Sequence, residues 1–282
     1  MMIKTNGYAK INLFLEIVNK RKDGYHNIDS IFQTISIADQ LKLERRKDTN
    51  IVIEMGNYKI PLKKNIVYKV LKFFKEYFDI SDGFNVFIKK NIPIGSGLGG
   101  SSADAAALLK ALKKLYQVEY DDKFFNKISF LGADIKFQYY QGLAKVGGIG
   151  NRIKLIPHKL KGYLLIGYPG LIIESNWAYK NINLVLTDNR FHSNILVRYL
   201  KQGDFEGVFQ SLYNTFEDLV FDAYPLVEKL KNDFLKEGAL TALMSGSGSS
   251  VFAIFEDYYN VRRARENLQK RWDWLKIAEF VY

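Results

Sequence analysis

The strongest chemical signal in the sequence is a glycine-rich loop followed by an alanine-rich segment. Four glycines fall within the six residues Gly95–Gly100, and Ser101 and Ser102 follow directly. Glycines permit positive φ angles and let the backbone approach a ligand closely. Unpaired N–H groups at the start of a following helix favour anions, phosphates above all. We therefore predict a phosphate-binding loop, and weigh it against a flexible loop that merely precedes a packing helix.

Two familiar phosphate motifs do not describe this loop. No lysine follows the glycines, so it is not a Walker A loop, and the βαβ context of a dinucleotide fingerprint is missing. A second glycine loop runs from Met244 to Ser250 between two predicted strands. Alone it is typical of a permissive hairpin turn. Beside the first loop it would form a second wall of a polyanion site.

Two charged residues are candidates for catalysis. Lys10 lies in an apolar strand pattern, where a lysine needs an acceptor or extends its head to solvent. Asp134 lies between Gly132-Ala133 and an apolar run, which fits either a helix N-cap or a buried general base. Three scattered histidines without an i, i+4 pair argue against a histidine metal site, and Asp23-Gly24 indicates a turn before Tyr25-His26.

Composition narrows the classes of protein that remain. The 282 residues contain 48% hydrophobic side chains and no cysteine, which excludes global disorder, disulfides and thiol chemistry. Residues 1–150 hold 24 Lys/Arg against 15 Asp/Glu, and the remainder holds 17 against 15. The basic half suggests an anionic partner or, more plainly, a solvated lysine-rich surface. No apolar run reaches the roughly 20 residues of a membrane helix, so we expect a cytoplasmic protein.

The hydrophobic periodicity predicts an α+β chain without sustained βα alternation. We expect a hairpin at 51–60 that turns at Gly56-Asn57, and a helix after the N-cap Asn65. At the C-terminus, strand–strand–helix–strand order suggests a ferredoxin-like unit. Further predicted strands are 9–18, 28–43, 84–88, 163–168, 239–244, 251–256 and 276–281, and further predicted helices are 101–117, 121–130, 175–183, 193–201, 204–213, 225–237 and 258–271.

Taken together, these segments resemble the GHMP kinase superfamily nearly end to end. The matching blocks are the strand from Ala9 to Leu15, the phosphate loop, Leu131–Asp134 and the second glycine loop, with Gly147–Gly150 and Tyr168–Gly170 between them. The segment Arg21–His26 followed by Ile31-Phe32-Gln33 resembles the branch that acts on a CDP-linked polyol.

The resemblance implies a two-domain fold and a reaction. The fold has an N-terminal ATP- and substrate-binding domain (1–155), like a domain of a ribosomal protein, and a C-terminal ferredoxin-like α+β domain (156–282). The reaction is ATP-dependent phosphorylation of the 2-hydroxyl of the methylerythritol moiety, a step of non-mevalonate isoprenoid synthesis, with ATP and Mg²⁺ as cofactors. The expected partner is a small CDP-linked polyol, with no nucleic acid and no membrane, in a monomer or weak homodimer.

The same resemblance implies roles for individual residues. Asp134 would be the general base, and Lys10 would stabilise charge on the hydroxyl and γ-phosphate. Ser102 would contact Mg²⁺. The predicted ATP-binding residues are Asn65, Pro93, Gly95, Ser96, Gly97, Leu98, Gly99, Gly100, Ser101 and Ser102. The predicted substrate-binding residues are Asn12, Tyr25, His26, Ser175, Tyr179, Gly246, Ser247 and Gly248.

Two other functions are weighed against this one. A nucleic-acid-binding protein would explain the basic first half, but the basic residues are scattered and no RNA-binding motif is present. A sister kinase acting on mevalonate, homoserine or a sugar would share the glycine loops, but not the Arg21–His26 segment. A substrate panel in an ATP-consumption assay separates the three.

Overall fold

The computed structural model describes residues 2–182 and 192–282. The chain forms two compact units whose segments alternate along the sequence. The first comprises Met1–Ala9, Ile37–Ile92 and Gly99–Tyr140, and the second comprises Lys10–Ser36, Pro93–Leu98 and Gln141–Tyr282. The long strands β1 (Met2–Lys20) and β2 (His26–Arg46) therefore each contribute to both units. The predicted domains, 1–155 and 156–282, are instead two continuous stretches of chain. This division stays a prediction.

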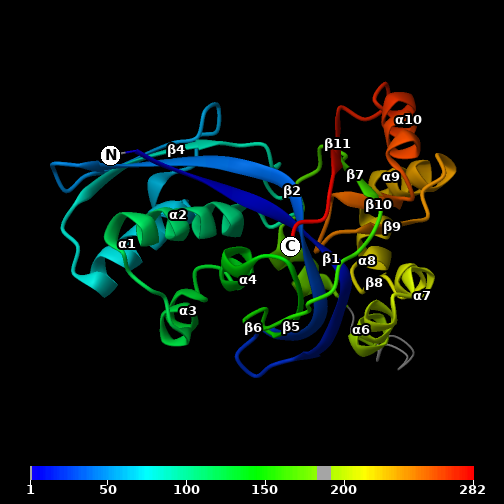
Figure 1. The fold of residues 1–282 in the computed structure, drawn as a ribbon, viewed down its shortest axis with the longest axis horizontal. Coiled ribbons are helices and arrows are strands. Elements are labelled where there is room, and N and C mark those ends of the chain that lie inside the picture. Colours follow the sequence, from blue (N-terminus) through cyan, green and yellow to red (C-terminus); the bar gives the residue numbers. More distant parts are fainter. Residues whose placement is uncertain (1, 183–191) are drawn as a thin grey trace. The chain divides into compact units, whose positions relative to one another are not determined.

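The first unit is a small sheet covered by helices (Figure 1). Strand β4 (Gly83–Lys89) pairs antiparallel with the end of β2 and parallel with β3 (Ile51–Glu54). Its core lies between this sheet and the helices, and includes Leu43, Phe74, Val86 and Leu108. The unit's other elements are η1 (Leu62–Lys64), α1 (Ile66–Phe78), α2 (Gly100–Tyr116), α3 (Asp122–Ile128) and α4 (Ile135–Tyr140).

The second unit contains an antiparallel sheet in the order β11-β7-β10-β9. Helix α9 (Pro225–Lys236) packs on β9 and β10, and α10 (Tyr258–Leu268) packs on β7 and β11. The predicted strand–strand–helix–strand order is confirmed by β9, β10, α10 and β11. The strands are β7 (Tyr163–Tyr168), β9 (Thr241–Met244), β10 (Val251–Phe255) and β11 (Trp274–Ala278).

The rest of the second unit surrounds the shared strands. The first part of β2 pairs with β5 (Leu143–Gly148), β5 pairs with β6 (Arg152–Leu155), and β8 (Tyr213–Asn214) pairs in parallel with β1. Its remaining helices are α5 (Ser175–Asn181), α6 (Ser193–Gln202), α7 (Phe205–Gln210) and α8 (Glu217–Ala223). The predicted end of α5 at residue 183 lies outside the described residues. Across 2–182 and 192–282, no helix is both long and apolar enough to cross a membrane.

One predicted element is wrong. The hairpin expected at 51–60 has only its first strand, because β3 ends at Glu54 and residues 55–61 form turns and coil. The alternating residues of β3 pair with β4, a strand about thirty residues further along, and not with their immediate neighbours. Residues 58–60 are exposed and lead through Pro61 into the short helix η1. Six elements were not predicted, namely β5, β6, β8, α4, α8 and the short helix η1.

Candidate active site

The phosphate loop leads directly into helix α2. Gly99 occupies the N-cap with φ at 71°, and no side chain caps the helix there. Only a residue that tolerates positive φ fits this position easily. The Ala103 N–H donates to the Gly99 carbonyl at 2.9 Å. The start of α2 therefore has the uncapped N–H groups and the positive dipole end that suit an anion.

Ser102, in the first turn of α2, lies next to the segment that contains Asp134. Ser102 is buried, and its Oγ would be only 3.2 Å from a Cβ placed on Gly132. Gly132 is two residues before Asp134. Asp134 directly precedes α4, and its carbonyl accepts from the Gln138 N–H at 2.9 Å. The Gly-Ala-Asp segment and the helix that follows the phosphate loop are thus neighbours.

Asn65 caps helix α1 as predicted and lines a cavity. Its Oδ1 accepts from the Val67 N–H at 2.9 Å, and its Nδ2 lies 3.1 Å from the sulfur of Met55. The cavity has a volume of about 580 Å³ and lies wholly within the first unit. Its other lining residues were not predicted; they include Glu54, Tyr58, Ile60 and Leu62.

In the second unit the two glycine loops touch each other at Gly97. A Cβ at Gly97 would be 2.1 Å from the Ser245 carbonyl oxygen, so no other residue fits there without a shift of backbone. The Ser245 hydroxyl donates to the Gly97 carbonyl at 3.1 Å, and the Ser250 N–H donates to the Ser96 carbonyl at 3.0 Å. The two glycine loops therefore pack against each other, and their role as two walls of one polyanion site stays a prediction.

Lys10 lies beside both loops. Its N–H donates to the Leu98 carbonyl at 3.0 Å, and a Cβ at Gly246 would be 3.5 Å from its Nζ. The side chain is only 5% exposed, so its ammonium does not extend into solvent. It donates to Asn12 Oδ1 and lies 4.7 Å from the centre of the Phe32 ring. The fold therefore holds the Lys10 ammonium in the protein interior, next to the second glycine loop.

Four of the predicted substrate residues of the second unit lie in contact as two pairs. His26 and Tyr179 stack with ring centres 5.3 Å apart, and Ser175 Oγ lies 3.0 Å from Ser247 Oγ. Burial, helped by the charge of Lys20, lowers the pKa of His26, so its ring is neutral at pH 7. Tyr25 is 57% exposed and follows the Asp23 turn.

Sequence reasoning missed a buried ionic cluster and a buried amide. Lys90 lies between the carboxylates of Asp39 and Asp104, and Asn214 hydrogen-bonds the second glycine loop. The sequence contains a signal for the ionic cluster, because the acidic Asp104 interrupts an alanine run just after the phosphate loop. No pattern marks Asn214, because the loop carbonyls that it bonds lie thirty or more residues away.

Comparisons with known proteins agree with this arrangement of loops and helices. The GHMP kinases N terminal domain matches residues 65–144, and the GHMP kinases C terminal domain matches residues 196–273. A protein of Lachnoclostridium phytofermentans named 4-diphosphocytidyl-2-C-methyl-D-erythritol kinase is 36% identical over 93% of this chain and 91% of its own. One of the same name from Thermodesulfovibrio yellowstonii is 34% identical over 96% of each chain.

Solved structures give the same answer. A crystal structure of 4-(cytidine 5'-diphospho)-2C-methyl-D-erythritol kinase superposes with a TM-score of 0.82 at 28% identity, over 98% of this chain and 99% of that one. A homoserine kinase from Cytophaga hutchinsonii shares the fold, with a TM-score of 0.78 at 19% identity over 99% and 95% of the two chains. The predicted two-domain α+β fold is confirmed, and the chain belongs to the GHMP kinase family, among its 4-diphosphocytidyl-2-C-methyl-D-erythritol kinases.

Proposed function

We propose that this small-molecule kinase transfers the γ-phosphoryl group of ATP to the 2-hydroxyl of 4-diphosphocytidyl-2-C-methyl-D-erythritol, in non-mevalonate isoprenoid synthesis. The observation that carries the proposal is that residues 95–98 of the phosphate loop, the second glycine loop and Lys10 meet within one compact unit. The same unit contains the His26–Tyr179 stack, whose aromatic faces suit a cytosine base.

The transfer needs one bond made and one broken. The 2-hydroxyl oxygen forms a bond to the γ-phosphorus while the bond to the β,γ-bridging oxygen breaks and ADP leaves. Asp134 takes the hydroxyl proton, and Lys10 stabilises negative charge on the transferring group. Family resemblance assigns these two residues to one reaction.

ATP would be held by the phosphate loop, the start of α2 and the cavity at Asn65. The cavity is lined mostly by apolar and aromatic side chains, with the amide of Asn65 and the charged Glu54 and Lys59, which suits a nucleobase with its polar edge groups. The N–H groups at the start of α2 suit the phosphates.

Mg²⁺ fits the oxygen donors near the helix start. Ser102, in the first turn of α2, supplies a hydroxyl, and no group of three or more His, Cys, Asp or Glu side chains in the described parts of the chain could hold a metal by itself. An ion carried by the phosphates and held by one or two protein oxygens is typical of Mg²⁺ in kinases. When bound, it neutralises charge on the β- and γ-phosphates.

A substrate panel tests the proposal. ATP consumption is measured with the CDP-linked polyol, mevalonate and homoserine at equal concentrations. We expect turnover with the first and little with the other two, because the His26–Tyr179 stack has no partner in them. Faster turnover of mevalonate or homoserine would assign the chain to a sister activity. Salt-dependent RNA binding together with an absence of any turnover would refute a kinase.

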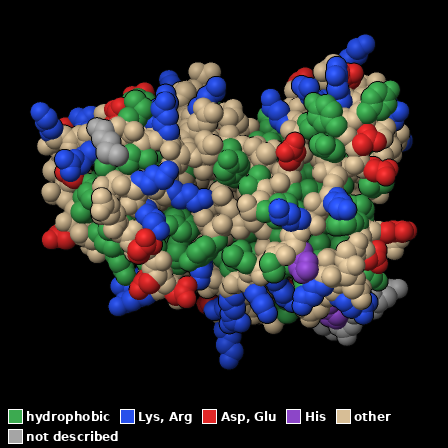
Figure 2. Space-filling model, viewed as in Figure 1, with side chains coloured by type: hydrophobic (Ala, Val, Ile, Leu, Met, Phe, Trp, Pro, Cys, Tyr) green, Lys and Arg blue, Asp and Glu red, His purple; other side chains and the backbone are tan. Residues whose placement is uncertain are grey.

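The charged surface bears on the nucleic-acid alternative. The basic residues on the face seen in Figure 2 are interspersed with acidic ones and form no single patch there.

A further inference from the structure

The second glycine loop, Met244–Ser250, is buried along its whole length, so its backbone polar groups need partners. The hydroxyl-bearing residues Ser245, Ser247, Ser249 and Ser250 are all buried. A loop that offers backbone to a ligand on one side must be held from its other side, since buried backbone groups without partners are costly. The segment Asn214–Glu217, which runs from the end of β8 into α8, supplies partners for the N–H and carbonyl of Met244 and for the carbonyl of Gly246.

The side-chain amide of Asn214 bonds the loop through both of its N–H groups. The side chain is 3% exposed, and its Nδ2 donates to the carbonyls of Met244 and Gly246, both at 2.8 Å. Its Oδ1 accepts from the Phe216 N–H at 3.0 Å. Both N–H bonds of the amide are used, and they fix the carbonyls on either side of Ser245.

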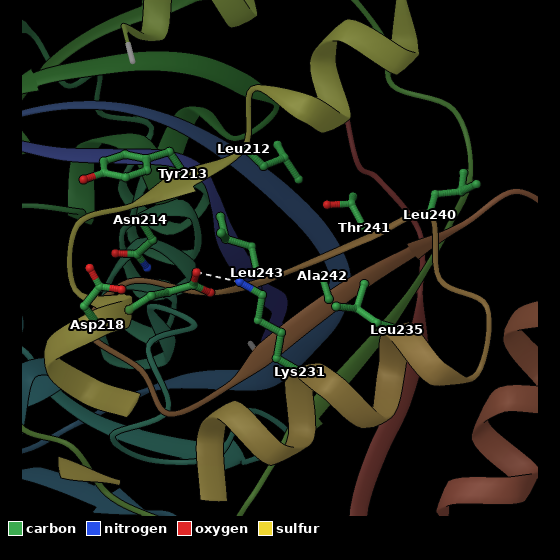
Figure 3. A pocket seen from close by; sticks show the side chains of 11 residues that line it. Leu212, Tyr213, Asn214, Asp218, Lys231, Leu235, Leu240, Thr241, Ala242 and Leu243 are labelled. Carbon is green, nitrogen blue, oxygen red and sulfur yellow. Dashed lines mark hydrogen bonds and ion pairs between the residues drawn. The ribbon is translucent and has the colours of Figure 1, made fainter. Parts of the chain in front are cut away.

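Glu217, three residues after Asn214, also bonds the loop at Met244. Its Oε1 accepts from the Met244 N–H at 2.9 Å, and its Oε2 accepts from Lys231 Nζ at 2.7 Å. Figure 3 shows Asn214 and Lys231 lining one pocket, with this ion pair drawn as a dashed line. Met244, the residue that enters the loop, is therefore held at its N–H by Glu217 and at its carbonyl by Asn214.

Other residues of the second glycine loop contact the phosphate loop and Lys10, which we assign to the proposed reaction. Ser245 bonds Gly97 of the phosphate loop, and Gly246 lies beside Lys10. Phe216, within the same segment, meets Tyr179 edge-on with ring centres 5.0 Å apart. The segment Asn214–Glu217 thus supports both the second glycine loop and the ring that stacks on His26.

We infer that Asn214 and Glu217 are positioning residues that hold the second glycine loop in the shape needed to bind the CDP-linked substrate. The inference rests on the proposed function for the identity of that substrate. The Lys231 ion pair has no direct bond to the loop, so it orients Glu217 and is dispensable for the loop itself.

Four variants separate these roles. Asn214→Asp keeps the size and the acceptor but removes both donors, and Glu217→Leu removes the acceptor. Glu217→Gln keeps an acceptor for the Met244 N–H, and Lys231→Met is the matched control that breaks only the ion pair. We expect kcat/KM for the CDP-linked substrate to fall by about tenfold or more in the first two, mainly through KM. The other two stay within about threefold.

A second measurement keeps the test decisive. Hydrogen exchange of the loop amides is measured without substrate, well below each variant's unfolding temperature. Faster exchange at residues 245–250 in Asn214→Asp and Glu217→Leu, with unchanged exchange in the β-strands, supports the positioning role of both residues. This holds even if the wild type fails to phosphorylate the CDP-linked polyol. Wild-type exchange and kcat/KM in those two variants would overturn the inference. Equal losses in Glu217→Gln and Lys231→Met would also overturn it, since the ion pair would then be responsible.

Discussion

Lys90 Nζ lies 2.7 Å from the carboxylate of Asp104, with the two side chains only 4% and 3% exposed. Asp39 contacts the same ammonium, and its Oδ1 accepts from the N–H groups of Asn91 and Ile92 at 2.6 and 2.9 Å. This cluster ties β2 to α2 and to the residues just before the phosphate loop. Two carboxylates share one lysine there, so one carboxyl group is expected to hold a proton.

That arrangement predicts a pH-dependent stability. Burial, with the nearby Asp39 charge, raises the pKa of Asp104 to about 8, although Lys90 opposes the shift. The folded state thus keeps a proton that the unfolded state releases above about pH 4, so this group's contribution to stability falls as pH rises toward about 8. Asp104→Asn, which mimics the protonated acid, lacks this dependence.

The prediction is checked by urea unfolding of both proteins between about pH 5 and about pH 9. The free energy of unfolding of the wild type, relative to Asp104→Asn, should decrease across that range. A difference that does not change with pH would show that Asp104 is already ionised in the folded protein.

Asp134→Asn should remove a general base while preserving the fold. We expect kcat to fall by about 10²- to 10⁴-fold, with an unfolding temperature close to that of the wild type. Asp122→Asn is the matched control, because that carboxylate is 81% exposed in an ion pair with Lys136. Activity of Asp134→Asn within a few fold of the control would leave Asp134 with only the role of orienting the hydroxyl.

Gly97→Ala should disturb the contact between the two loops. The new methyl group would meet the Ser245 carbonyl oxygen, and the residue has a φ of 77°. Gly142→Ala is the matched control, since Gly142 also has positive φ but open space around it. The control should cost about 1 kcal/mol of strain. Gly97→Ala should cost more and also raise the KM for ATP; equal effects in the two variants would mean that the contact is unimportant.

Tyr179 should contribute to substrate binding through its ring. Tyr179→Leu removes the aromatic face beside His26, while Tyr179→Phe keeps it. Stacking on a base is worth roughly 1–3 kcal/mol, so the KM for the CDP-linked substrate should rise about tenfold in Tyr179→Leu and little in Tyr179→Phe. If both variants behave alike, the hydroxyl group or the packing against Phe216 is what matters.

Local signals in the sequence predicted the parts of this site that are contiguous. The phosphate loop, the N-cap at Asn65 and the C-terminal strand–strand–helix–strand order depend on residues close together in the chain, where glycine, capping and periodicity act directly. The strand expected near Ile60 was wrong because β3 pairs with a distant strand, and pairing partners are not encoded in local alternation.

Contacts between distant segments were beyond such reasoning. Lys90 and Asp39 are 51 residues apart, and Asn214 and Gly246 are 32 apart. A buried lysine and a surface lysine look alike in a sequence, as do a buried and an exposed asparagine. Only the fold distinguishes them, by what it packs around each side chain.

The central claim is that the phosphoryl group goes to the 2-hydroxyl of the CDP-linked polyol. The most direct test is the ³¹P NMR spectrum of the purified product. Carbon 2 is tertiary and bears no hydrogen, so a phosphate there gives a phosphomonoester signal without three-bond coupling to a proton. We predict that uncoupled signal together with the two diphosphate signals. A phosphomonoester signal split by one or two protons would place the phosphate on another hydroxyl and contradict the account.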